Sequence, residues 1–194
     1  MANVKIKKEY VDMIAEAKKK WDESPPEMKA QWLAGIPKRV VGFLLLWDTL
    51  KAIEKKFNNV DVWNITRKIT YNAAFAHGQK LAEKYKKFGR QGLKELYDGY
   101  FSAYEGVCDF EYLEFDDEVL SLWAHTCPFT QVLKDMGRTE EEIKEIAPLF
   151  NLWEYGVISG FNPGFENFPQ PRLIMKGDSH STYYIENPGK RREL

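Results

Sequence analysis

One of two groups of side chains suited to chemistry lies in residues 125–128, His-Thr-Cys-Pro, in a chain of 194 residues. Residues 119–127 are rich in branched and aromatic side chains and alternate in polarity, which predicts a strand. Alternate side chains of a strand lie on one face, so we expect His125 and Cys127 to project together beside Trp123. An imidazole next to a thiol favours the reactive thiolate.

A second reactive group lies in residues 177–180, Gly-Asp-Ser-His. This segment is predicted to be the tip of a hairpin that joins residues 172–176 to residues 181–185. Asp178 and His180 are two positions apart and should lie close to each other. If the two hairpins pair in one sheet, a thiol, two imidazoles and a carboxylate meet at one end of it.

Such a cluster admits two kinds of catalysis. In the first, Cys127 attacks the substrate, His125 or His180 transfers protons, and Asp178 orients an imidazole. In the second, the same four side chains bind a divalent metal such as zinc, which activates a water molecule. A purely structural interpretation stays open, in which His125 and Cys127 face the core and Asp178 shapes a turn.

The first half of the chain, residues 1–105, is predicted to be mainly helical, because apolar side chains recur there at helical spacing. Asp61 is the expected N-cap of a helix that continues to Phe88. An earlier helix over residues 38–57 is apolar on all sides in its front half, which is typical of the centre of a bundle.

The second half, residues 106–186, is predicted to form a sheet with short helices. The first hairpin joins residues 110–115 to the strand described above. Thr139 forms a capping box with the residue three positions later and opens a helix that should stop before Pro148. The tail, residues 187–194, is expected to fray.

These patterns together predict the fold class α+β, in a single domain that spans residues 1–194. An N-terminal layer of four or five helices packs on a small antiparallel sheet formed by the C-terminal hairpins. A separate helical domain is not expected, because the helices could not bury their tryptophan and leucine face without the sheet.

Composition and charge exclude several classes of protein. Hydrophobic residues make up 44% of the chain, too many for a disordered protein, and the formal net charge of -1 gives no cationic field for nucleic acid. No stretch approaches the ~20 apolar residues of a membrane span, and no signal peptide is evident. Two cysteines are too few for a disulfide framework. We therefore expect a cytoplasmic protein with a small-molecule partner and without nucleic-acid or membrane partners.

The order of these segments resembles the L-2-amino-thiazoline-4-carboxylate hydrolase family. That family has a helical first half, then strands, a Cys-Pro segment that opens a short helix, and a late Gly-Asp-x-x-Cys element. The matching stretches here are residues 125–129, 160–163 (Gly-Phe-Asn-Pro) and 175–180 (Met-Lys-Gly-Asp-Ser-His). His180 stands where the family usually has a second cysteine, a change that keeps a metal ligand and removes a dithiol.

The resemblance implies a hydrolase-like enzyme that acts on a small cyclic C–N or C–S compound, with a divalent metal as the one cofactor considered. Its pocket is expected between the sheet end and the helical layer, rimmed by the loop over residues 160–171. Arg172 is the expected partner of a substrate carboxylate. The expected substrate-binding residues are Trp123, Phe161, Asn162 and Arg172.

The alternative function is a non-catalytic small-molecule-binding or sensor domain with an aromatic pocket. A binding module needs an apolar cavity but no convergent histidine, cysteine and aspartate side chains. A structure that places His125 and His180 far apart would therefore favour the binding module.

Overall fold

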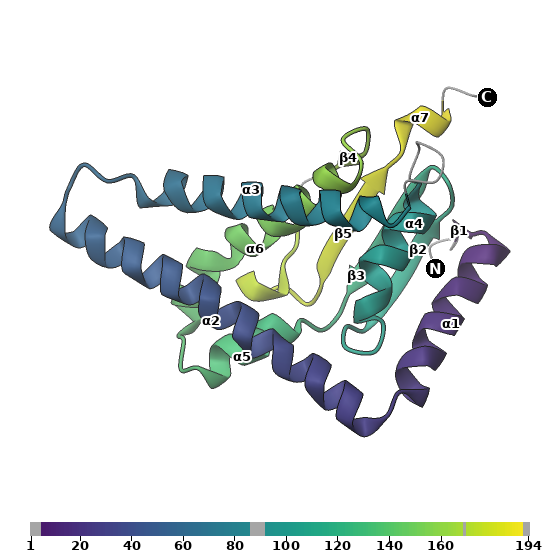
Figure 1. Ribbon diagram of the computed structural model, residues 1–194, viewed down its shortest axis with the longest axis horizontal. Coiled ribbons are helices and arrows are strands. Elements are labelled where there is room, and N and C mark those ends of the chain that lie inside the picture. The colour runs from purple at the N-terminus through teal and green to yellow at the C-terminus, as the bar shows by residue number, and fades with distance from the viewer. Residues whose placement is uncertain (1–4, 86–91, 169, 192–194) are drawn as a thin grey trace.

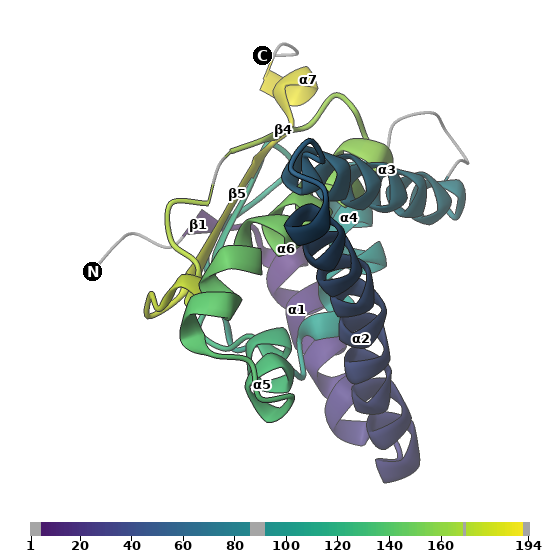
Figure 2. The ribbon, with the colours of Figure 1, turned by 90° about the vertical axis from the view of Figure 1, so that its left-hand side faces the viewer.

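Helices cover one face of a twisted sheet in the computed structural model, which describes residues 5–85, 92–168 and 170–191 (Figures 1 and 2). The helices are α1 (Lys8–Glu23), α2 (Pro26–Lys56), α3 (Val62–Glu83), α4 (Leu93–Gly99), α5 (Pro128–Asp135), α6 (Glu140–Phe161) and α7 (Pro188–Arg191). Short 3-10 turns are η2 (Phe101–Tyr104) and η3 (Ile174–Lys176). The strands are β1 (Lys5–Ile6), β2 (Phe110–Phe115), β3 (Val119–Ala124), β4 (Glu166–Asn167) and β5 (Ser181–Glu186). The α+β class is confirmed, with most helices preceding most strands.

The sheet has the order β1-β2-β3-β5-β4, and every pairing except that of β1 with β2 is antiparallel. β2 and β3 form the predicted first hairpin. Its turn is held by Asp116, whose carboxylate accepts from the backbone N–H groups of Glu118 and Val119 at 2.7 and 2.8 Å. The short outer strands β1 and β4 were not predicted, because two residues carry no periodic pattern.

The second predicted hairpin takes a different form. Residues 172–176 make the η3 turn in place of a strand, and β5 pairs with β3 and β4. The carboxylate of Asp178 accepts from the backbone N–H of Leu173 at 2.8 Å, and Gly177 has a φ of +95°. This side-chain bond and the left-handed glycine close a compact loop before β5 begins.

Asp61 and Thr139 cap helices as predicted, whereas the helix predicted over residues 38–57 begins earlier, at Pro26, and α6 ends later than predicted. Asp61 accepts from the backbone N–H of Asn64 at 3.0 Å, and Thr139 forms the expected capping box with Glu142. α6 continues through Pro148 to Phe161, because its apolar residues pack against α3 on one side and the sheet on the other. α3 ends at Glu83, with Lys84 as its C-cap, so the helix stops before the predicted end at Phe88, a residue outside the described ranges.

α3 and α6 pack at unusually close range. A Cβ atom at Gly160 would lie 2.1 Å from the backbone oxygen of Phe75, and one at Gly78 would lie 2.1 Å from that of Val157. Glycine is therefore required for the two backbones to approach, as in other close helix crossings. This contact fixes the middle of α6 relative to α3.

The buried residues form two clusters, one where α1, α3 and α4 pack on the sheet and one among α2, α5 and α6. Among the described residues, none of the helices has the length and apolar character needed to cross a membrane.

Candidate functional site

The two histidines expected in the site come together on the sheet face that the helices leave uncovered. His180 is buried and stacks on Trp123 with ring centroids 4.4 Å apart, and the rings of His125 and His180 are 5.8 Å apart. The Nε2 atom of His125 lies 2.8 Å from a carboxylate oxygen of Glu111 on β2. Because side chains alternate along β3, Trp123 points away from the face on which Ala124 lies.

Cys127 lies on the other side of the sheet. β3 ends at Ala124, so the strand alternation stops before Cys127, which is the N-cap residue of α5. Its thiol lines a cavity between the helices and the sheet. Burial raises the pKa of Cys127, although hydrogen bonds from Thr130 act in the opposite direction. Burial thus disfavours the thiolate of Cys127, and neither His125 nor His180 lines the cavity with it.

The other expected site residues have structural surroundings. Asp178 is exposed and holds the η3 turn, and Arg172 is exposed. Phe161 is only 2% exposed and belongs to the core, and the side chain of Asn162 accepts from the backbone N–H of Gly164 at 2.9 Å. None of these four, nor Trp123, lines the cavity.

The expected metal site does not assemble in the part of the chain that the structure describes. No group of three or more histidine, cysteine, aspartate or glutamate side chains there is placed to hold a metal ion. The donor sets therefore do not fit a divalent metal, and we derive no step through one.

The cavity has a volume of about 590 Å³ and lies between α2, α3 and α6 on one side and β2, β3 and β5 on the other. Phe43 on α2, Phe129 on α5 and Phe150 on α6 pack as a tilted aromatic cluster along one wall. Tyr100 and Tyr104 contribute a second aromatic wall. A volume of this size suits a small organic molecule, since ligand pockets typically measure roughly 300–1,000 Å³.

A carboxylate lies inside this largely apolar cavity. Glu154 on α6 accepts one hydrogen bond at each oxygen, from the hydroxyl of Tyr183 and from the amide of Gln170, both at 2.8 Å. No ion pair joins it to a lysine, arginine or histidine in the described ranges. Burial raises the pKa of Glu154 to about 7, because the two hydrogen bonds offset only part of the lost hydration.

Two amide oxygens of the cavity are buried and have no hydrogen-bond partner in the described structure. They are Oδ1 of Asn151, one turn before Glu154 on α6, and Oε1 of Gln170, whose nitrogen donates to Glu154. A buried acceptor without a donor is costly. These two amide oxygens and the carboxylate of Glu154 therefore form one end of the cavity, the acceptor end, which suits a ligand that carries N–H groups.

Cations lie at the exposed side of the same cavity. Lys38 and Arg39 on α2 line it and are exposed, and the guanidinium of Arg39 lies 5.6 Å from the ring of Trp32. His77 on α3 lines it as well and lies 6.0 Å from the ring of Trp153. Partial burial is the main cause that lowers the pKa of His77. The cavity is thus acidic inside and basic at its rim.

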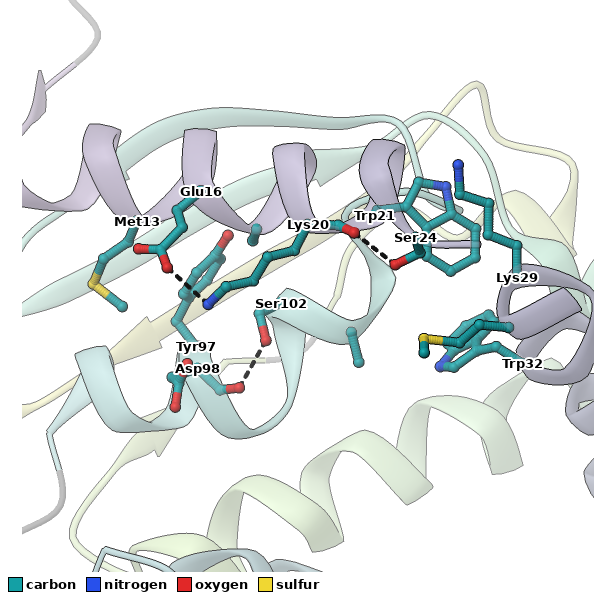
Figure 3. Close-up of a pocket in the computed structure, with 13 residues that line it drawn as sticks. Met13, Glu16, Lys20, Trp21, Ser24, Lys29, Trp32, Tyr97, Asp98 and Ser102 are labelled. Carbon is teal, nitrogen blue, oxygen red and sulfur yellow. Dashed lines mark hydrogen bonds and ion pairs between the residues drawn. The ribbon is translucent and has the colours of Figure 1, made fainter. Parts of the chain in front are cut away.

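A second hollow of about 330 Å³ lies between α1, the start of α2 and α4 (Figure 3). Its polar groups bond to one another: Glu16 pairs with Lys20 at 2.8 Å, and the Ser102 hydroxyl donates to the backbone oxygen of Asp98 at 2.7 Å. No unpartnered buried side-chain atom faces it among the described residues, and the carboxylate of Glu16 is exposed, with a pKa that the hydrogen bond from Lys20 lowers. It lacks the features of a reactive site.

Sequence reasoning missed Glu154, although one signal could have found it. Glu154 is the only charged residue between residues 146 and 161, a segment that is otherwise almost entirely apolar. A single carboxylate in an apolar helix is expected either to be paired or to serve a site.

The model of the family described as L-2-amino-thiazoline-4-carboxylic acid hydrolase matches residues 42–183. The matched region begins at a cavity residue of α2 and ends at Tyr183 on β5, so it contains most of the cavity wall. No curated protein and no solved structure matches the chain.

Proposed function

Because this chain belongs to the L-2-amino-thiazoline-4-carboxylic acid hydrolase family, we propose that it hydrolyses a small cyclic C–N/C–S carboxylate in the cavity between the helices and the sheet. The observation that carries the proposal is the polarity of that cavity, which has acceptors inside and cations at its rim. The compound in the family name has a carboxylate at one end and a ring carbon bonded to two nitrogens and one sulfur at the other.

The two ends of such a compound fit the two ends of the cavity. Its N–H groups would donate to the unpartnered oxygens of Asn151 and Gln170. Its carboxylate would pair with Arg39 or Lys38, because charge-assisted hydrogen bonds to a carboxylate are among the strong ones in proteins. The reacting ring carbon would then lie between them, along the aromatic walls.

Water is the nucleophile that this environment favours. Hydrolysis forms a bond between the water oxygen and the ring carbon and breaks a ring C–N or C–S bond, and the leaving atom takes up a proton. A thiolate attack by Cys127 would need a lowered pKa, whereas burial raises it. The paired histidines lie away from the cavity, so the proposal gives them no contact with the substrate.

Turnover of L-2-amino-thiazoline-4-carboxylate tests the proposal. We expect the purified chain to convert it to a product heavier by one water, detected by mass spectrometry. Gly42 lines the cavity, and a Cβ atom there meets no atom within 4 Å, so Gly42→Trp is tolerated by the backbone and fills open space. We expect that variant to lose activity about tenfold or more, because the indole would occupy space that the substrate needs. A tenfold loss corresponds to ~1.4 kcal/mol of binding free energy. Gly42→Ala is the matched control and should keep it.

Arg39→Gln provides a second test, directed at the rim. Loss of a charge-assisted bond of about 1.5–3 kcal/mol should raise KM roughly 10- to 100-fold with little change in kcat. Full activity of both Gly42→Trp and Arg39→Gln would place the reaction elsewhere.

The aromatic walls also support the second candidate, a non-catalytic binding domain. Binding of the compound without conversion, measured by calorimetry and mass spectrometry on one sample, would favour that candidate over hydrolysis.

A further inference from the structure

We infer that Glu154 is the proton carrier of the site, taking a proton from the attacking water and returning it to the ring atom that leaves. This inference rests on the proposed function and names the group that performs its acid–base step. It is carried by the position of the carboxylate in the cavity wall, beside the unpartnered oxygens of Asn151 and Gln170 and without an ion-pair partner in the part of the chain that the structure describes.

The surroundings of Glu154 hold its carboxylate in place without neutralising it. Tyr183 on β5 and Gln170 each donate to one oxygen, so every oxygen keeps a lone pair for a further donor. α6 itself is fixed by the close crossing with α3 at Gly156 and Gly160. A general base must be both oriented and within reach of a water proton, and this arrangement supplies the orientation.

A purely structural role explains these contacts less well. Removing a carboxylate from bulk water is costly unless a cation or several donors compensate, and a neutral glutamine could make similar bonds to Tyr183 and Gln170. The protein therefore bears a cost for a charge that its packing does not need. Such a cost is typical of groups that serve a reaction.

The titratable groups that face Glu154 come from several elements. They are Tyr100, Tyr104, Cys108, Cys127, Tyr155 and Tyr183. Burial raises the pKa of each of them, so all six stay neutral near pH 7. The basic groups of the lining are Lys38, Arg39 and His77 at the rim. Among the groups around the acceptor end, Glu154 is thus the one that changes charge near neutral pH.

Glu154 carries one of the two protons of the attacking water. The substrate enters with its amidine protonated; ionised Glu154 accepts a proton as the water oxygen bonds to the ring carbon, and the C=N π electrons pass to nitrogen, which leaves a neutral tetrahedral intermediate. As the ring C–N or C–S bond breaks, its electron pair goes with the leaving nitrogen or sulfur, which takes the proton from Glu154. The hydroxyl of the intermediate becomes the product carbonyl and its proton passes to solvent, in place of the proton that the amidine brought in. The carboxylate is regenerated, and one water is consumed.

Kinetics of Glu154→Gln on L-2-amino-thiazoline-4-carboxylate test the inference. We expect kcat to fall about 10²- to 10⁴-fold, the range typical of a lost general base, while the dissociation constant measured by calorimetry changes little. Glu154→Asp should recover part of the activity. Glu141→Gln, an exposed change on the same helix, is the control for handling and folding.

The pH profile supplies a readout that a structural role would not move. For the wild type, kcat/KM should fall as the pH drops below about 7, because the base must be ionised. Tyr183→Phe removes a hydrogen bond that lowers the pKa of Glu154, so its acid limb should move to higher pH.

The outcomes separate the two proposals. An active wild type with an equally active Glu154→Gln variant, or with a profile that Tyr183→Phe leaves in place, would overturn the role of Glu154 alone. An inactive wild type would overturn the proposed hydrolysis and this inference together.

Discussion

The stability of the protein should depend on pH through Glu154, and Glu154→Gln should remove that dependence. Burial raises the pKa of this carboxyl from 4.5 to about 7 in the folded protein. The folded state therefore binds the proton more tightly than the unfolded state does. The resulting stabilisation is complete below pH 4.5 and is lost as the pH rises through about 7.

The size of the effect follows from the two pKa values. A rise from 4.5 to about 7 corresponds to at most about 3 kcal/mol of unfolding free energy. The carboxylate faces a cavity that water can enter, which reduces the penalty of ionisation, so about 2 kcal/mol is expected between pH 5 and pH 8. The wild type should lose this amount relative to Glu154→Gln over that interval.

Urea unfolding of both proteins at pH 5 and pH 8, followed by circular dichroism, measures the difference. Other titrating groups cancel when the two proteins are compared at the same pH. Glu141→Gln, on the exposed side of α6, should follow the wild type. A difference in unfolding free energy between the wild type and Glu154→Gln that is the same at pH 5 and pH 8 would refute this reasoning. That result would mean that Glu154 ionises in the fold as easily as in the unfolded chain.

Four substitutions test the packing and the chemistry. Gly160→Ala should destabilise the protein by about 3 kcal/mol or more in urea unfolding, since its Cβ would meet a backbone oxygen at 2.1 Å, whereas Gly42→Ala, in open space, should stabilise it by about 0.5–1 kcal/mol. Tyr97→Phe should cost about 1.5–3 kcal/mol in the same assay, because its hydroxyl donates to the buried carboxylate of Glu105 at 2.7 Å. Cys127→Ala should lower kcat by less than about tenfold if water is the nucleophile, and a loss of activity to background would make the thiol the attacking group.

Local chemistry was enough to predict much of the fold. Asp61 and Thr139 cap helices where their sequences indicate, and the acidic turn before β3 closes the first hairpin. These features depend on a few neighbouring residues, so a single sequence contains the information. The short strands β1 and β4 depend on distant partners, and nothing in two residues reveals those partners.

The continuation of α6 through Pro148 has a similar explanation. A proline inside a helix removes one backbone hydrogen bond, which predicts a stop when only local terms are weighed. Packing of α6 between α3 and the sheet outweighs that loss. The longer helix has a functional consequence, since Glu154 lies in the part that the prediction left out.

The candidate site was harder to predict because it depends on where one strand ends. Period-two alternation places His125 and Cys127 on one face only while the chain stays extended, and β3 stops at Ala124. Beyond that point the turn into α5 sends Cys127 into the cavity, while His125 and His180 meet on the uncovered face. The sheet therefore separates Cys127 from the two histidines that the sequence pattern placed beside it.

The polarity of the cavity gives a stronger argument for function than any one of those residue types. A histidine or cysteine can be buried at little cost, and its presence alone says little. An ionisable carboxylate without a cation is different, since each such group lowers stability at the pH where it ionises. Glu154 lies next to the unpartnered oxygens of Asn151 and Gln170, so one end of the cavity holds three acceptor groups that each lower the stability of the fold. A ligand with N–H groups would satisfy all three at once, which explains why a stable fold can keep them.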